Sequence, residues 1–402
     1  MPSSPANRQL LASVRRSLKR HTADLVAFAS ELVAVPSENP PGAQYRRCAS
    51  LIARWLRELE LTVRTTNPTG RGPCVAGTFG DGRPLYFSGH YDVVPAQQAS
   101  QFTPFVRKSN LHGRGTADMK GGIAAMAFAI RALIDTGFEP HGRLVSISVP
   151  DEETSGPNGT VALAKSGFID RDALGMLTME PTGGVVWNAN RGVISMRISV
   201  RGKPAHVGMH FRGRNAFRDM LIVADQFVAL ERQVSARRTR FGIRPDAARR
   251  SILLLGGELA GGHNFNVVPD RVSFTLDRRT NPEEDFDGEC DRLFAVLEQA
   301  RARGVACDAM VLQEGRSAAT PTTGALGRAL ASSVREVTGT PARFELCPGV
   351  LETRHYAALE IPAMAYGPGL LSVSHGPHEF VSIPKLVRCA EVYARTAVAL
   401  LG

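Results

Sequence analysis

The sequence has no long hydrophobic run. A transmembrane helix needs about 20 consecutive apolar residues, and the apolar stretch Gly121–Ile130 has only ten. We therefore expect no membrane-spanning segment. The six cysteines lie far apart along 402 residues and form no C-x-x-C pair. Reduced thiols, rather than a disulfide framework, are expected.

The N-terminal region lacks acidic residues and has no hydrophobic signal core after Met1. A basic, acid-free start is a weak feature of organelle transit peptides. However, Leu11, Val14, Leu18 and Leu25 recur at helical spacing, and an amphipathic helix running from about Gln9 to Val33 is the preferred interpretation. We expect a cytoplasmic protein.

Aromatic residues are few near the basic clusters. The net charge is +10, from 48 Lys and Arg against 38 Asp and Glu. Such an excess is typical of nucleic-acid-binding proteins, yet the clusters Arg237–Arg240 and Arg249–Arg250 lack the interleaved aromatics on which bases stack. A basic surface that attracts acidic small ligands is preferred, and neither nucleic acid nor membrane is expected as a partner.

The pattern of apolar residues predicts an interrupted α/β fold. Hydrophobic residues make up 43% of the chain and charged residues 21%, as in ordinary globular proteins. Strand-like and helix-like segments alternate before Pro181, which favours a mixed, mainly parallel sheet. After Pro181, the alternating segment 193–201 and a strand–helix–strand–strand–helix order predict an inserted α+β domain. The expected limits are 1–185, 186–302 and 303–402, with the first and last parts forming one catalytic domain.

The segment SGHYDVVP follows an expected strand at Pro84–Ser88 and contains His90 and Asp92. Residues two apart in extended chain point to the same side. A metal-bound histidine usually has a carboxylate on its second ring nitrogen, and Asp92 is suited to that role. A capped turn with a surface histidine is the alternative.

Further carboxylates and histidines stand at other expected strand or loop ends. GRGTADMKGG contains Asp118, for which a helix N-cap is the alternative role. PDEETSG follows a buried strand and contains Glu152 and Glu153; successive acids repel unless a cation or protons compensate, and a solvated acidic turn is the alternative. MEPT contains Glu180, and SHGPHEF contains His375.

Together these residues suit a pair of divalent metals. Imidazole nitrogen and carboxylate oxygen are ligands for Zn²⁺, Co²⁺ or Mn²⁺. Two histidines and three carboxylates hold two ions if one carboxylate bridges them, and Asp118 is the natural bridge. The ligand candidates are His90, Asp118, Glu153, Glu180 and His375. Glu152 then remains as a general base.

The five motifs, in this order and spacing, resemble the dinuclear-zinc amidohydrolases of the M20 class, close to the acetylornithine deacetylase and succinyl-diaminopimelate desuccinylase branch. The resemblance implies that His90 and Glu180 complete one metal and that Glu153 and His375 complete the other. It implies that Glu152 is the base and later the acid, and that Asp92 orients His90. It also implies a cis peptide between Asp118 and Met119.

The inserted domain resembles the ferredoxin-like lid and dimerisation domain of that class. The segment GKPAH matches a motif whose histidine, here His206, reaches the partner subunit's active site and stabilises the oxyanion. Asn266 and Arg279 match substrate-binding positions. Arg278 and Arg354 remain alternatives for holding a substrate carboxylate.

Two departures from the class bear on specificity. Leu351-Glu352-Thr353-Arg354 stands where many members have Thr-Asp-x-Arg, in a region that lines their substrate pocket. His378 replaces the usual Asp or Asn, and is either a substrate or ligand-supporting contact or an exposed loop residue.

The resemblance implies a homodimeric, metal-dependent hydrolase with two divalent ions, Zn²⁺ first and Co²⁺ or Mn²⁺ as alternatives. The expected reaction is cleavage of an amide bond in an N-acyl amino acid or a similar small substrate with a free carboxylate. An aminopeptidase or dipeptidase of the same class is the first alternative. A binding protein that kept the fold and lost catalysis is the second.

Overall fold

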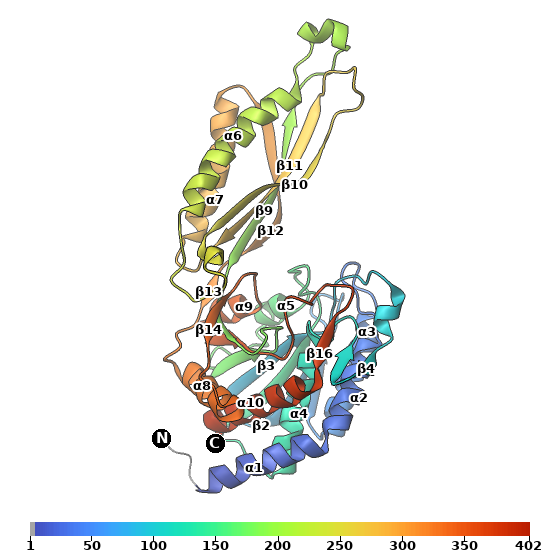
Figure 1. Ribbon diagram of the computed structural model, residues 1–402, viewed down its shortest axis with the longest axis vertical. Helices are drawn as coiled ribbons and strands as arrows, with labels where there is room; N and C mark the ends of the chain where they lie inside the picture. The colour runs from blue at the N-terminus through green and yellow to red at the C-terminus, as the bar shows by residue number, and fades with distance from the viewer. Residues whose placement is uncertain (1–4) are drawn as a thin grey trace. The chain divides into compact units, whose positions relative to one another are not determined.

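The computed structural model describes residues 5–402, which form two compact units (Figure 1). The first unit contains the chain up to Asn188, Thr320–Glu345 and His355–Gly402. The second contains Ala189–Ala319 and Leu346–Arg354. Most of the expected inserted domain, 186–302, therefore lies in the second unit, which also includes the strand that follows residue 302.

A mixed, mainly parallel sheet forms the centre of the first unit, which confirms the predicted fold class. Its strands lie in the order β1-β2-β6-β3-β7-β15-β8. The central strands β6, β3, β7 and β15 are parallel to one another, whereas β1, β2 and β8 pair antiparallel with the strands beside them. The bounds are β1 Thr62–Thr66, β2 Cys74–Gly80, β3 Pro84–His90, β6 Arg143–Val149, β7 Gly175–Thr178, β8 Val186–Asn190 and β15 Ala363–Ala365.

Both faces of this sheet are buried because its residues alternate between two apolar clusters. In β3, Leu85 and Phe87 join one cluster, while Tyr86 between them joins the other. The first cluster is built with the helices α1 Pro5–Arg20, α2 Thr22–Val33, α3 Tyr45–Glu58, α4 Lys120–Asp135, α8 Ala325–Thr338 and α10 Ile383–Leu401. The second cluster includes side chains of the short helices α5 Thr160–Lys165 and α9 Thr353–Ala357.

The prediction of a single helix from Gln9 to Val33 is wrong in one respect. The chain forms two helices, α1 and α2, that meet at His21. The His21 imidazole lies between two carboxylates, with Nδ1 2.8 Å from Asp24 and Nε2 3.3 Å from Asp135. The apolar spacing was still informative, since Val14 and Leu25 are fully buried.

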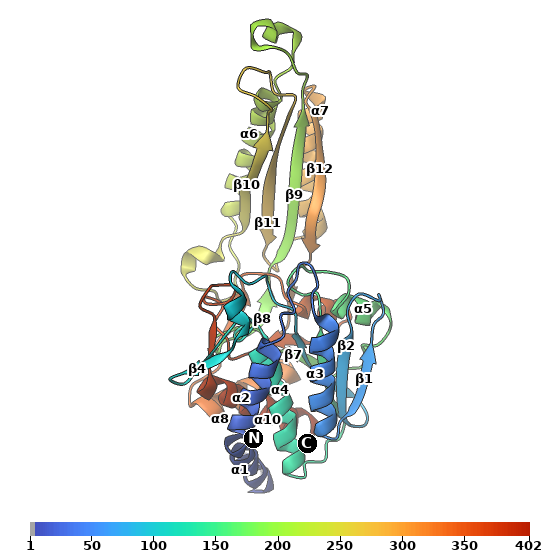
Figure 2. The same ribbon diagram turned by 90° about the vertical axis from the view of Figure 1, so that its right-hand side faces the viewer.

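The second unit is a four-stranded antiparallel sheet in the order β10-β11-β9-β12 (Figure 2). Along the chain, β9 Gly192–Arg201, α6 Ala216–Ser235, β10 Ile252–Gly261, β11 Arg271–Thr280, α7 Phe286–Ala302 and β12 Ala306–Gly315 follow one another. This β-α-β-β-α-β order is ferredoxin-like. Alternate residues of β9, such as Met196 and Ile198, pack with α6 and α7 in one core.

Shorter elements complete the chain. A three-stranded sheet joins β4 Phe105–Arg107, β5 Asn110–His112 and β16 Phe380–Ser382. The strands β13 Ala318–Ala319 and β14 Phe344–Cys347 both pair with β8. Short 3₁₀ helices lie at Ala99–Phe102, Val207–Arg212 and Asp246–Arg249. Across residues 5–402, no helix combines the length and apolar character needed to cross a membrane. All six cysteines are free thiols.

Candidate active site

The candidate active site lies where parallel strands of the first unit end. His90 is the last residue of β3, Glu152 and Glu153 follow β6, and Glu180 follows β7. The loop after β15 leads to His375. Because β6, β3, β7 and β15 are parallel neighbours, their carboxyl ends meet at one edge, which is where open α/β sheets bind ligands.

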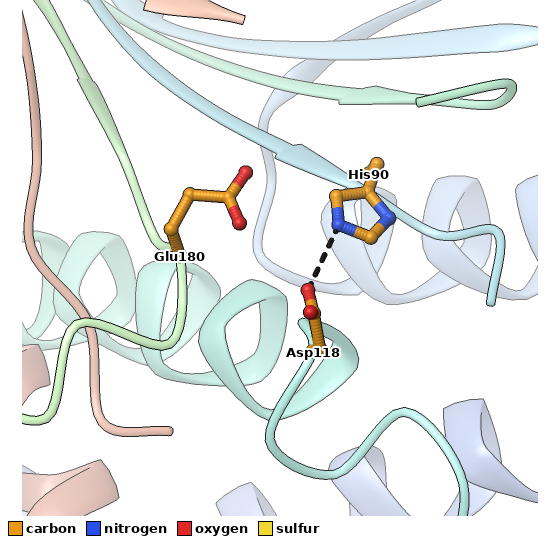
Figure 3. A group of neighbouring side chains, drawn as sticks. All are labelled: His90, Asp118 and Glu180. Atoms are coloured by element: carbon orange, nitrogen blue, oxygen red, sulfur yellow. Dashed lines mark hydrogen bonds and ion pairs between the residues drawn. The ribbon is translucent and has the colours of Figure 1, made fainter. Parts of the chain in front are cut away.

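One group of side chains at this edge comprises His90, Asp118 and Glu180 (Figure 3). All three are buried, and one ligand atom from each lies within 4.8 Å of the others. The three side chains point toward one another from the end of β3, the turn before α4 and the segment after β7. Nε2 of His90 lies 3.1 Å from Oδ1 of Asp118.

A second group comprises Asp118, Glu153 and His375, again with ligand atoms within 4.8 Å of one another. Nε2 of His375 lies 3.3 Å from Oδ2 of Asp118 and 3.2 Å from Oε2 of Glu153. Asp118 thus belongs to both groups and offers a different oxygen to each histidine. This is the arrangement that a bridging carboxylate requires.

The imidazole of His90 is oriented from its far side. Its Nδ1 lies 3.0 Å from the backbone oxygen of Asp92 and 3.4 Å from the Asp92 carboxylate. Nδ1 therefore faces Asp92, while Nε2 faces Asp118. This is the orientation expected of a metal-bound histidine with a carboxylate behind it.

Glu152 stands beside the groups without belonging to either of them. Its Oε2 lies 3.9 Å from Nε2 of His90, and its side chain is 15% exposed. A carboxylate in this position adjoins the ligands and is still reached by solvent. It is therefore placed to exchange a proton with a water molecule at the site.

The electrostatics of the two groups fit divalent cations. Burial raises the pKa of Glu153. Burial would also raise the pKa of Asp118, but its bonds to His375 and His90 hold that pKa below its usual range. Bonds to Asp118 and Glu153 raise the pKa of His375 to about 10. The carboxylates thus attract positive charge, and a nitrogen-and-oxygen donor set without thiolate suits two divalent ions.

Asn39 supports the site and was not identified from the sequence. Its amide nitrogen donates to Oδ2 of Asp92 at 2.9 Å and to Oδ1 of Asp151 at 3.2 Å. Asp92 Oδ2 also accepts the backbone N–H of Glu153 at 3.1 Å. Asn39 lies in the turn-rich segment SENPPG. The composition of this segment predicts a loop but does not predict which residues the loop contacts.

Gly367 permits a close backbone approach at the same edge. A Cβ at this position would lie 2.2 Å from the carbonyl oxygen of Glu180 and 2.3 Å from that of Met179. Any larger residue would push the strand-end segment of Glu180 away from His90 and Asp118. The peptide between Asp118 and Met119 is cis, as the family resemblance implied.

The second unit contains the other predicted site residues. His206 is exposed and adjoins the turn that contains Asn266, whose carbonyl accepts the N–H of Val207 at 3.0 Å. Nδ1 of His206 accepts the N–H of Gly208 at 3.1 Å. In the neutral ring the proton is therefore on Nε2, which makes Nε2 a donor.

The three arginines considered for a substrate carboxylate differ in their surroundings. Arg278 is fully buried and bonds Glu284 and Glu289 at 2.6 and 2.8 Å. Arg354 is buried and donates to the carbonyl of Leu351. Arg279 is 26% exposed and bonds Asp277. Arg279 is thus the most accessible of the three, and Arg278 has a structural role.

His378 is exposed and lines a cavity of about 440 Å³ together with residues of the β4–β5 region, including Phe105 and His112. It belongs to neither ligand group. His378 therefore lies in the same loop as His375 but is not one of the candidate ligands.

A parallel α/β sheet carrying two ligand groups that share one carboxylate is the architecture of a dinuclear metal hydrolase. Residues 86–399 match peptidase family M20/M25/M40. The chain belongs to this family.

Curated relatives and solved structures agree with this assignment. A probable succinyl-diaminopimelate desuccinylase of Staphylococcus aureus (strain Mu50 / ATCC 700699) is 31% identical over 237 residues, which cover 53% of this chain and 58% of that relative. The chain thus spans little more than half the length of that relative. The succinyl-diaminopimelate desuccinylase of Alkalilimnicola ehrlichii is 28% identical over 395 residues, covering 94% of this chain and 100% of the relative.

Two solved structures show the same fold. A dipeptidase from Saccharomyces cerevisiae has a TM-score of 0.78 at 16% identity and covers 97% of this chain and 98% of its own. A dinuclear metal-binding M20 peptidase from Bacillus subtilis has a TM-score of 0.70 at 17% identity, with coverage of 95% and 99%.

Proposed function

We propose that this protein is a metal-dependent deacylase that hydrolyses the amide bond of an N-acyl amino acid or a similar small, carboxylate-bearing substrate. The observation that carries the proposal is the position of Asp118 in both ligand groups, with Glu152 beside them. The desuccinylase names of the sequence relatives support an acyl-amino-acid substrate.

His90 and Glu180 would hold one ion, Glu153 and His375 the other, and Asp118 both. We propose Zn²⁺ as the native ion, with Co²⁺ and Mn²⁺ as functional alternatives, because imidazole and carboxylate bind all three. Two such ions supply Lewis acidity and a water of lowered pKa.

Glu152 would perform the proton transfers. It accepts a proton from the attacking water and afterwards donates one to the departing amine, so that the amine leaves as a neutral group. His90 keeps its orientation through Asp92, and Asp92 in turn is held by Asn39 and the N–H of Glu153. The chain therefore fixes the ligand geometry before substrate arrives.

The second unit would act as lid and dimerisation domain in a homodimer. His206 is exposed, and its Nδ1 is already occupied by the N–H of Gly208. We propose that Nε2 donates to the oxyanion in the partner subunit's site. Asn266, whose backbone lies beside His206, would contact the same substrate.

Arg279 would bind the substrate carboxylate. Its guanidinium is partly exposed and bonds Asp277, which prepares the planar fork to receive a second, bidentate acceptor. Arg354 is the alternative residue for binding this carboxylate.

We also propose that the protein is located in the cytoplasm.

A substrate screen tests the proposal directly. N-acetyl, N-succinyl and N-formyl amino acids and unblocked dipeptides are offered to the chelator-treated protein after addition of Zn²⁺, Co²⁺ or Mn²⁺ separately. We expect release of free amine from an N-acyl amino acid only with metal. Turnover confined to dipeptides would instead assign the protein as a dipeptidase. Ligand binding that is unaffected by chelator, without turnover, would identify a binding protein.

A further inference from the structure

A buried ion pair links the two loops that carry Asp118 and His375. Arg114 precedes Asp118 by four residues, and Glu379 follows His375 by four residues. Nη1 of Arg114 lies 2.7 Å from Oε2 of Glu379, and each side chain is only 1% exposed. Neither residue belongs to a candidate ligand group.

Two further atoms of this pair, Nη2 of Arg114 and Oε1 of Glu379, bond the ligand loops themselves. Oε1 of Glu379 accepts the backbone N–H groups of Ala117 at 2.9 Å and Asp118 at 3.1 Å. Nη2 of Arg114 donates to the backbone carbonyl of His375 at 3.1 Å. Each member of the pair therefore bonds the loop that the other member belongs to.

Stability alone is a poor reason for this arrangement. Removing two charges from water is costly, and apolar residues of similar volume are often as stabilising as a buried ion pair. The loop of His375 needs additional bonds to hold it in position, because the His375 side chain is 50% exposed and little protein packs around it. A planar guanidinium can bond two acceptors in fixed directions at once, whereas the ammonium of a lysine is a single point charge.

We propose that Arg114 and Glu379 are positioning residues that set the separation between Asp118 and His375, and thereby the metal affinity of the group Asp118, Glu153 and His375. The proposal rests on the two-metal function given above. Bonds behind a metal ligand typically contribute about 10–100-fold to metal affinity or activity.

The test uses Arg114→Lys and Glu379→Gln in the full-length protein. Arg114→Lys keeps the charge but loses the two-directional donor. Glu379→Gln keeps an acceptor for the two N–H groups but loses the ion pair. The matched controls are Arg395→Lys and Glu391→Gln, which change a second buried-glutamate ion pair in the same unit, 2.9 Å between Nη2 and Oε1.

Two readouts separate positioning from general stability. Co²⁺ binding to the chelator-treated protein gives stoichiometry and affinity by calorimetry, and the visible absorption of bound Co²⁺ reports ligand geometry. Thermal unfolding of the metal-free protein measures stability alone. We expect both site variants to bind one of the two Co²⁺ ions at least tenfold less tightly, with an altered spectrum. The controls should match the wild type in Co²⁺ affinity and spectrum while losing comparable Tm.

Two results would overturn the proposal, and they are distinguishable. If the wild type binds two Co²⁺ and the site variants bind both with wild-type affinity and spectrum, the pair is only structural and the proposed function stands. If the wild type itself binds no Co²⁺, the proposed function fails and this inference fails with it.

Discussion

Asp92 touches His90 twice, once through its backbone oxygen at 3.0 Å and once through its carboxylate at 3.4 Å. The hydrogen bond to the backbone oxygen, with the carboxylate close to the same ring nitrogen, fixes both the tautomer and the plane of the imidazole. The second nitrogen is therefore the only one available to a metal, and it points at Asp118. The orientation of His90 is therefore set by Asp92, which follows it by only two residues in the chain.

Replacing Glu152 by Gln should separate catalysis from metal binding. We expect the variant to retain two ions per chain and to lose about 10²–10⁴-fold in kcat, because a general base contributes that much. The matched control is the neighbouring change Glu153→Gln, which should lose one ion. Metal content by elemental analysis and steady-state kinetics measure both. Near-native kcat in Glu152→Gln would show that another group moves the proton.

Replacing Asn39 by Asp should weaken metal binding indirectly, through Asp92, which Asn39 contacts. The new carboxylate would face Asp92 and Asp151 where an amide now donates to both, and like charges in a buried place repel strongly. We expect a lower Tm for the metal-free protein and weaker metal binding. Asn67→Asp adds the same charge where the side chain only accepts, from the N–H of Gly72, and should change neither. An unaffected Asn39→Asp protein would show that Asp92 needs no amide donor.

Mixing two inactive variants tests the role of His206. In a homodimer with action in trans, one site of a Glu152→Ala and His206→Ala heterodimer contains both functional residues. Activity should then return on subunit exchange, to at most half the wild-type value per heterodimer, because only one of its two sites is complete. Loss of one oxyanion donor costs about 10²–10³-fold in kcat, so the return is readily measured. A mixture that remains inactive after exchange is verified by mass spectrometry would place His206 elsewhere.

The Arg279→Met variant should raise KM and lower kcat together for an acidic substrate. Amidation of the substrate carboxylate should then harm the wild type strongly and the variant little, because the interaction is already absent. Kinetics on the paired acid and amide substrates measure this. Equal losses in both proteins would direct attention to Arg354.

Acid should destabilise the second unit through Glu289. Burial alone would raise the pKa of this carboxyl, but bonds to Arg278 and Arg237 hold it below the usual 4.5. A carboxyl with a depressed folded-state pKa adds stability that is present above about pH 4.5 and is lost as pH falls through the lower, folded-state value. Calorimetry from pH 7 to pH 3 should show the Tm difference between wild type and Glu289→Gln shrinking below pH 4.5. A constant difference would contradict this linkage.

The sequence predicted the candidate ligands better than it predicted their supports. His90, Glu153 and Glu180 each lie at or just after the end of an apolar strand, so they could be expected to meet at one edge of a parallel sheet. Asn39 lies in a loop whose path depends on tertiary packing, and nothing in SENPPG indicates where its amide points. Arg114 lies in GRGTADMKGG and Glu379 in SHGPHEF, but their bonds to each other's loops depend on the tertiary structure.

Alternation along β11 explains the difference between two adjacent arginines. Phe274, Leu276 and Arg278 share the buried face of this strand, and Arg279 falls on the other face. The helix break at His21 was missed because neither Pro nor Gly marks it.

The division of the first unit into separate chain segments has a consequence for the order in which the protein matures during synthesis. The group His90, Asp118 and Glu180 is encoded within the first 180 residues, whereas the group with His375 waits for nearly the last of the chain. Between them the ribosome makes β9 to β12, which together hold a core of their own. Since domains generally fold as units while the chain emerges, the second unit closes while β7 still lacks its neighbour β15. A nascent chain stalled before residue 363 therefore exposes an open sheet edge at β7 and contains four of the five candidate ligands but not His375, so both the sheet and the second ligand group are completed only by the C-terminal segment.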